Sequence, residues 1–184
     1  YIGQTNPAWR VGLHNEFRYK QFRFGFLFDA QFGAVGYSLT SATLAEQGKT
    51  KNTIPGRYNG IIGNGVIDNG DGTYRPNDVI ATNVWDYYNA HLGRDNVEGT
   101  SYSTDFLKLR EVRFDYTLNT ALLSRIGLQR ATIGVFGRDL FIWSSWPAFD
   151  PEFGTLGNGE ITRGFELGQF PATRTFGFNL VVGL

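Results

Sequence analysis

The chain has 184 residues, of which 17 are basic and 17 acidic, so its formal net charge is +0. This balance gives no electrostatic case for nucleic-acid binding. Cysteine is absent, which excludes a disulfide framework, thiolate metal sites and a cysteine nucleophile. No apolar run approaches the roughly 20 residues of a membrane-spanning helix, so any crossing of a bilayer must use strands.

Residues 9–36 predict a hairpin of two long strands, 9–19 and 22–36, joined at Lys20 and Gln21. Apolar residues alternate along both arms, which is the period of a strand. A two-residue connection brings the two apolar sets onto one face, pairing Tyr19 with Phe22. By the same register Phe17 pairs with Phe24, Leu13 with Phe28 and Val11 with Ala30.

The remaining alternation predicts three further strands, at 105–118, 130–142 and 173–184. In the strand 105–118 the apolar residues change parity near Arg110, which indicates a bulge or a strand end. The outward parity of 130–142 stays open, because Ala131, Ile133 and Val135 favour odd positions whereas Phe136, Leu140 and Ile142 favour even ones. The long segments 38–103 and 143–172 lack a core pattern; within the first, turn signals predict a small hairpin around residues 66–74, and 84–92 is compatible with a short helix.

The connections between these five strands run short, long, short, long, as periplasmic turns and extracellular loops do in a membrane barrel. Each hairpin arm also has the roughly 9 to 11 residues that a tilted strand needs to cross a bilayer. Five strands cannot close a barrel, and an open edge in lipid leaves backbone groups unpaired. The predicted fold class is therefore all-β, the C-terminal strands of a transmembrane antiparallel β-barrel with two long extracellular loops.

On this interpretation one face of the sheet contacts lipid and the other lines a watery lumen. The predicted lipid-facing residues are Phe22, Phe24, Phe26, Phe28, Phe176, Phe178, Leu180 and Val182. A soluble β-sandwich with one buried face also alternates, so it stays as an alternative, acting as a glycan-binding module. Methionine is absent, so Tyr1 is not expected to be a translational start, and we expect a processed or partial chain.

Several stretches, in this order, resemble SusC/RagA-like TonB-dependent outer-membrane transporters. They are Asn6-Pro7-Ala8-Trp9 with Tyr19-Lys20-Gln21-Phe22, Phe106-Leu107-Lys108-Leu109-Arg110-Glu111-Val112, Gly137-Arg138-Asp139-Leu140-Phe141, Phe149-Asp150-Pro151-Glu152, and Arg174-Thr175-Phe176. The resemblance spans nearly the whole chain. Two positions depart from the family pattern: Asp139 stands where asparagine is usual, and Leu184 where a terminal phenylalanine is usual.

The resemblance implies the last five strands of a barrel of about 22 strands, without the plug that contacts TonB. It implies import of oligosaccharides or peptides across the outer membrane of a Gram-negative-type bacterium, with no enzyme activity and no cofactor. Implied partners are a SusD-like lipoprotein, the TonB system through the absent plug, the lipid bilayer with lipopolysaccharide, and the oligosaccharide or peptide substrate. A structural barrel subunit of a larger outer-membrane complex is the alternative with the same fold.

Few residues stand out as candidate binding groups. Trp85, Tyr87 and Tyr88 in the segment 38–103 are predicted to contact a ligand or a lid protein, or else to form that segment's own small core. Asp150 and Glu152 are expected to order their loop through turn and salt-bridge contacts rather than to act as an acid and a base. His14, His91 and the turn-like stretch 68–72 lack the spacing of a metal site.

Overall fold

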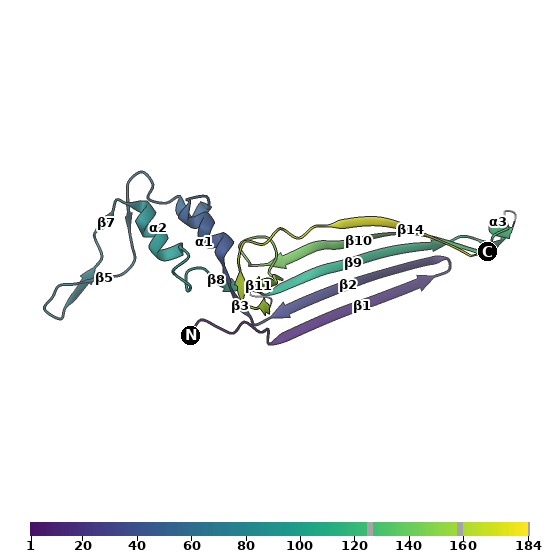
Figure 1. Cartoon of the computed structure of the whole chain (residues 1–184), viewed down its shortest axis with the longest axis horizontal. Coiled ribbons are helices and arrows are strands. Elements are labelled where there is room, and N and C mark those ends of the chain that lie inside the picture. The colour runs from purple at the N-terminus through teal and green to yellow at the C-terminus, as the bar shows by residue number, and fades with distance from the viewer. Residues whose placement is uncertain (125–126, 158–159, 184) are drawn as a thin grey trace.

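The computed structural model describes residues 1–124, 127–157 and 160–183. Its main feature is a five-stranded antiparallel sheet in the order β1-β2-β9-β10-β14 (Figure 1). The strands are β1 (Trp9–Tyr19), β2 (Phe22–Phe32), β9 (Phe106–Thr117), β10 (Arg130–Ser144) and β14 (Thr175–Gly183). They are long because an alternating pattern continues through each of them without a proline or a run of glycines.

The first hairpin has the predicted register. Tyr19 pairs with Phe22, Phe17 with Phe24 and Val11 with Ala30. Lys20 takes a positive φ of 53° at the turn, which a two-residue hairpin connection commonly requires. The prediction of the pairing and of the turn is therefore confirmed.

The connections sort to the two ends of the sheet, as expected from their lengths. The turn at Lys20 and Gln21, helix α3 (Thr120–Leu123) and the last described residues of β14 lie at one end (Figure 1). The segments 38–103 and 143–172, called here the first and second long loops, lie at the other. One end of the sheet therefore carries only short connections, and the opposite end carries both long loops.

The second arm of the hairpin ends earlier than the predicted Gly36. It stops at Phe32, and Gly33 follows with a φ of 82° and donates its N–H to Asp105 Oδ1 at 2.7 Å. The chain then starts a new strand, β3 (Val35–Ser38), which pairs with β8 (Ser101–Ser103) and β13 (Phe165–Glu166) in a separate sheet. Alternation alone did not show this break, because residues on both sides of Gly33 keep their apolar spacing. The observed ends of the other long strands differ from the predicted ends by at most two residues. Leu184 lies outside the described residues.

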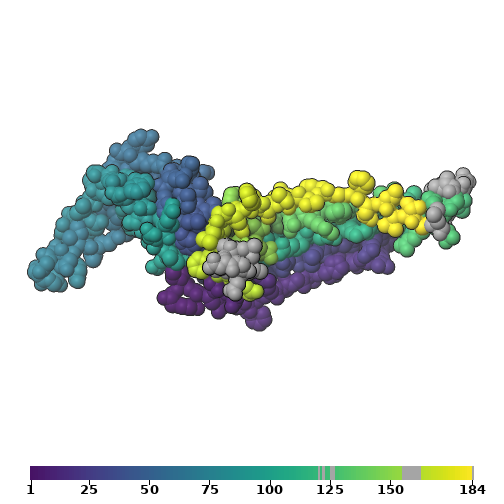
Figure 2. All heavy atoms as spheres, in the orientation of Figure 1, coloured from purple at the N-terminus to yellow at the C-terminus, as the bar shows by residue number. Residues whose placement is uncertain are grey.

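The first long loop projects beyond the end of the sheet (Figures 1 and 2). The predicted helix at 84–92 and the predicted hairpin around 66–74 are both present. Its elements are α1 (Leu39–Glu46), the 3-10 turn Lys51–Thr53, β4 (Ile61–Ile62), β5 (Val66–Asp68), β6 (Tyr74–Pro76), β7 (Ile80–Ala81) and α2 (Val84–Leu92). Ser38 caps α1 by accepting the Ser41 N–H, and Asn83 caps α2 by accepting the Asp86 N–H, which satisfies donors that a helix start leaves free.

The second long loop contains the short hairpin β11 (Thr155–Gly157) and β12 (Glu160–Thr162) before β13. Because β13 pairs with β3, this loop is joined to the start of the first one. Within residues 1–124, 127–157 and 160–183, no helix has the length and apolar character needed to cross a membrane.

Candidate functional site

The two faces of the five-stranded sheet differ in chemistry. One face, called the aromatic face, brings Phe24 opposite Phe114, Val135 opposite Phe114 and Phe178, and Ile133 opposite Leu180. All eight residues predicted to face lipid lie on it: Phe22, Phe24, Phe26, Phe28, Phe176, Phe178, Leu180 and Val182. Phe178 is 83% exposed. The opposite face, called the charged face, carries Arg10, Glu16, Arg23, Asp29, Lys108, Arg113, Asp115 and Arg138.

The bulge predicted near Arg110 is present. Leu27 of β2 pairs with Glu111, and the next residue, Phe28, pairs with Leu109, so Arg110 is the extra residue. An extra residue moves the apolar side chains of β9 from odd to even positions without leaving the aromatic face. On β10 the register also shifts between Arg138 and Phe141. The sequence left open which residues of β10 lie on the aromatic face; they are the odd-numbered ones, before and after this shift.

The bulge brings a cluster of charged side chains together on the charged face. Lys108 is 3% exposed, and its Nζ donates to Asp150 Oδ1 at 2.6 Å and also contacts Glu152. Arg110 donates to Asp29 Oδ2 at 2.7 Å and also to Glu152 and Asp139. We call these six residues the bulge cluster. It ties the second long loop to the wall of the sheet, which is the ordering role expected of Asp150 and Glu152.

Two features of the cluster explain how it holds its shape. Asp139 adopts a φ of 51°, a left-handed conformation that aspartate and asparagine tolerate better than most residues. Burial raises the pKa of Glu152, but the hydrogen bonds from Lys108 and Arg110 outweigh burial and keep that pKa below its usual range. The Glu152 carboxylate therefore stays ionised at neutral pH.

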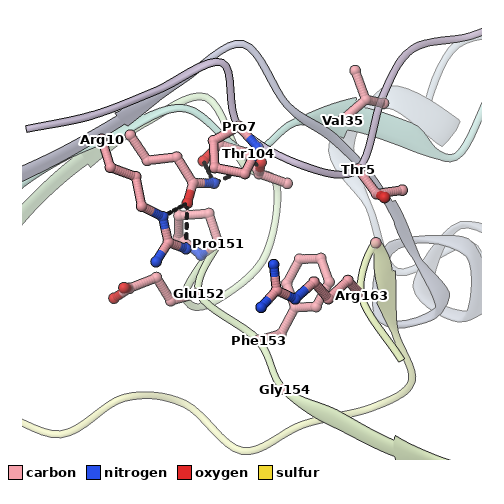
Figure 3. A pocket seen from close by; sticks show the side chains of 12 residues that line it. Thr5, Pro7, Arg10, Val35, Thr104, Pro151, Glu152, Phe153, Gly154 and Arg163 are labelled. Carbon is pink, nitrogen blue, oxygen red and sulfur yellow. Dashed lines mark hydrogen bonds between the residues drawn. The ribbon is translucent and has the colours of Figure 1, made fainter. Parts of the chain in front are cut away.

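A cavity of about 290 Å³ opens beside the cluster, where the first residues of the chain meet the second long loop (Figure 3). The guanidinium groups of Arg10 and Arg163 face each other across it. Arg10 donates from Nε and Nη2 to Gln31 Oε1 at 3.2 and 2.9 Å. Pro7, Pro151 and Phe153 supply apolar walls. The cavity therefore combines positive charge with apolar surface, as small-molecule sites often do.

The three aromatic residues predicted as ligand or lid contacts are divided between the interior and the surface of the first long loop. Tyr88 is 8% exposed and donates its hydroxyl to Pro55 O at 2.9 Å. Tyr87 stacks on His91 with a 4.2 Å centroid distance. Trp85 is 60% exposed, although its Nε1 donates to Glu46 O at 2.9 Å. Trp85 and Tyr88 line a second cavity of about 380 Å³ between α1 and α2, so only Trp85 presents a broad ring outward.

One buried carboxylate joins the two long loops. Glu166 is 1% exposed, and it accepts hydrogen bonds from Ser38 Oγ at 2.8 Å, Thr40 Oγ1 at 2.7 Å and the backbone N–H of Thr40, Gly168 and Gln169. Burial raises the pKa of Glu166, and these hydrogen bonds lower it further than burial raises it. We call this set of contacts the loop clasp. Sequence reasoning did not single out Glu166, since nothing local to it signals a partner.

The turn-like stretch 68–72 forms a turn in the structure. Asp68 Oδ1 accepts the Gly70 N–H at 2.8 Å, and Asp71 Oδ1 accepts the Thr73 N–H at 2.9 Å. In the part of the chain that the structure describes, no group of three or more histidine or acidic side chains is arranged to hold a metal ion.

Curated relatives of this chain are found across nearly its whole length. It is 25% identical over 97% of its residues to TonB-dependent receptor P3 of Formosa agariphila, and 24% identical over 92% to receptor P39 of the same organism. Receptor P26 is 31% identical over 49% of the chain. The chain is related to TonB-dependent receptors. It spans only 16%, 15% and 10% of the lengths of P3, P39 and P26.

Solved structures show the same fold as the sequence relatives imply. The chain matches structures of the RagAB peptide importer in its open-open and closed-closed states with TM-scores of 0.61 and 0.65. The matches cover 97% and 99% of this chain and 17% and 18% of those chains. The sequence identities are 13% and 14%. No family model matches the chain.

These findings confirm the expected resemblance to TonB-dependent receptors and the expected fold class. The five long strands are antiparallel barrel strands, and in the described residues they form an open sheet. The five long strands form one sheet whose aromatic face stays exposed, which does not support a β-sandwich.

Proposed function

We propose that this chain forms part of the wall and outer mouth of a TonB-dependent outer-membrane transporter. The observation that carries the proposal is the sheet with two unlike faces. Its aromatic face exposes Phe176 and Phe178, whereas its charged face carries the bulge cluster. A strand with lipid on one side and water on the other requires this division. In this proposal, transport is driven by TonB acting on a plug, and the relation to TonB-dependent receptors supports this source of energy.

The transported molecule in this proposal is an oligosaccharide or a peptide. The likeness to structures of a peptide importer supports the peptide class. The two long loops stand at one end of the sheet, where extracellular loops of a barrel lie, and there a SusD-like lipoprotein would cap the mouth. Exposed Trp85 in the first long loop is the residue we assign to that contact, with Tyr87 and Tyr88 supporting it from beneath. The chain itself contributes binding and passage, and no bond chemistry.

Two measurements on the full-length protein test this proposal. The first is extraction from outer membranes with detergent, followed by electrophoresis before and after boiling. A folded barrel migrates differently from its boiled form, so identical migration would contradict the wall assignment. The second is uptake of labelled peptides and oligosaccharides by cells with and without a functional TonB system.

Uptake also separates the transporter from a purely structural barrel subunit. A transporter accumulates at least one probe class in a TonB-dependent manner. A structural subunit gives the same migration shift on boiling, but its deletion leaves uptake of every probe unchanged.

A further inference from the structure

The cavity between Arg10 and Arg163 contains two guanidinium groups that form no ion pair with the side chains that the structure describes in residues 1–119, 127–154 and 163–183. On the charged face of the sheet Arg18, Arg23, Arg110, Arg113 and Arg138 pair with carboxylates, whereas Arg10 and Arg130 form no ion pair with a described side chain. Arg10 lines the cavity together with Arg163 of the second long loop (Figure 3).

Both arginines are oriented by neutral amide groups. Gln31 accepts from Arg10, and its own Nε2 donates to Thr104 Oγ1 at 3.1 Å. Gln31 is 5% exposed and Thr104 is 4% exposed, so this support is fixed within the wall. Asn6 Oδ1 accepts from Arg163 Nη1 at 3.3 Å. An amide oxygen positions a guanidinium without cancelling its charge, which leaves its other donors free for an anion.

One carboxylate, Glu152, also lines the cavity. Its Oε2 is already shared by Lys108 and Arg110, so its charge is compensated from the side of the bulge cluster. That cluster contains four carboxylates and two cations. The competing interpretation is therefore that Arg10 and Arg163 balance the cluster's surplus negative charge through space and bind nothing.

We propose that this cavity binds a carboxylate group of the transported molecule between the guanidinium groups of Arg10 and Arg163. Planar guanidinium donors match carboxylate oxygens in geometry. The apolar walls formed by Pro7, Pro151 and Phe153 suit the carbon atoms next to such a group. A volume of about 290 Å³ admits the end of a chain rather than a whole oligomer. The inference rests on the proposed transport function and narrows its substrates to those that carry a carboxylate.

The carboxylate has two possible sources, a peptide C-terminus or an acidic sugar, and the test includes both. Four probes are titrated against the full-length receptor in detergent: an N-acetylated tetra-alanine, its C-terminal amide, a tri-uronate, and a neutral trisaccharide of the same linkage. Binding is compared for the unaltered receptor, Arg10→Gln and Arg163→Gln. Arg75→Gln is the control, because Arg75 lies on the β5–β6 hairpin and does not line the cavity.

The unaltered receptor should bind one acidic probe about tenfold more tightly than its neutral counterpart, the value of one hydrogen-bonded charge pair. Arg10→Gln and Arg163→Gln should each abolish that preference, whereas Arg75→Gln should keep it. The probe pair that shows the preference identifies the source of the carboxylate.

Three binding results would overturn the inference. They are equal binding of acidic and neutral probes, a preference that survives both substitutions, and no binding of either acidic probe. If the substitutions instead make the second long loop more sensitive to trypsin and leave probe binding unchanged, the arginines serve charge balance. In the uptake assay, TonB-dependent uptake of a neutral probe alone would also refute this inference and leave the proposed transport function standing.

Discussion

The loop clasp makes the most specific prediction about how the outer end of the molecule is held. In Glu166, Oε1 accepts from Thr40 Oγ1 and from the N–H groups of Gly168 and Gln169, while Oε2 accepts from Ser38 Oγ and the Thr40 N–H. Glu166→Gln keeps the size of the side chain but turns one oxygen into an NH₂ group that faces donors. A hydrogen bond to a charged group contributes about 1.5 to 3 kcal/mol. We therefore expect Glu166→Gln to favour opening of the clasp by about 3 kcal/mol, roughly a hundredfold in the opening equilibrium.

Hydrogen exchange of the full-length receptor in detergent measures this effect. Amides of Thr40 and Gln169 should exchange roughly a hundredfold faster in Glu166→Gln, while amides in β9 should not change. Glu98→Gln is the matched control, since Glu98 is exposed in the same loop. Unchanged exchange at Thr40 and Gln169 would refute the reasoning, as would an equal change in the control.

Acidification should act on the same contact. Because the pKa of Glu166 is lowered from 4.5 in the folded protein, the clasp has its full stability above pH 4.5 and loses it as pH falls through the folded-state pKa. Pepsin cleavage of the first long loop should therefore rise in this range in the unaltered receptor. In Glu166→Gln cleavage should already be high at the upper end of the range and depend less on pH.

Three other changes test the remaining parts of the structure. Arg110→Gln should destabilise the attachment of the second long loop by about 1 to 3 kcal/mol, which trypsin cleavage after Arg163 should detect as a faster rate. A double-mutant cycle with Glu152→Gln should show coupling, and additive effects would contradict the ion pair. Phe178→Arg should lower the unfolding free energy in vesicles by up to about 2 to 4 kcal/mol, depending on depth, whereas Phe178→Leu should cost far less, and equal costs would argue against contact with lipid. Trp85→Ala should weaken binding of a partner lipoprotein and, like Tyr88→Phe, should cost about 1 kcal/mol of stability through one lost hydrogen bond. Tyr88→Phe should leave that binding intact, and the reverse pattern of binding would show that the buried ring makes the contact.

Sequence alone was sufficient for features that depend on local alternation. The register from Val11–Ala30 to Tyr19–Phe22 follows from parity and a two-residue turn, and the bulge at Arg110 follows from a parity change. Both are properties of neighbouring residues, because side chains of a strand alternate between two faces. The sequence was only compatible with a helix at 84–92, and the structure shows that Asn83 caps it and Gly93 follows it.

Contacts between distant segments were not accessible in this way. Lys108 contacts Asp150, which is 42 residues away in the sequence, and Glu166 contacts Ser38, which is 128 residues away. Their meeting depends on how each long loop folds back, and irregular loops carry no periodic pattern. The early end of β2 at Phe32 has the same origin, because the Gly33 N–H donates to Asp105, which lies between β8 and β9 and is distant in the sequence.

The way the first long loop leaves and rejoins the sheet has a consequence for how such proteins diversify. Val35 pairs with Ser103 and Tyr37 with Ser101, so the chain departs and returns through two adjacent, hydrogen-bonded strands. Anything placed between them leaves the register of the wall untouched. Residues 42–99, which lie beyond the Thr40 contacts of the loop clasp, can therefore be exchanged for a loop of another length or composition while the strands below keep their sequence. Such a junction allows the surface at this end of the sheet to evolve, or to be changed by grafting, independently of the five long strands.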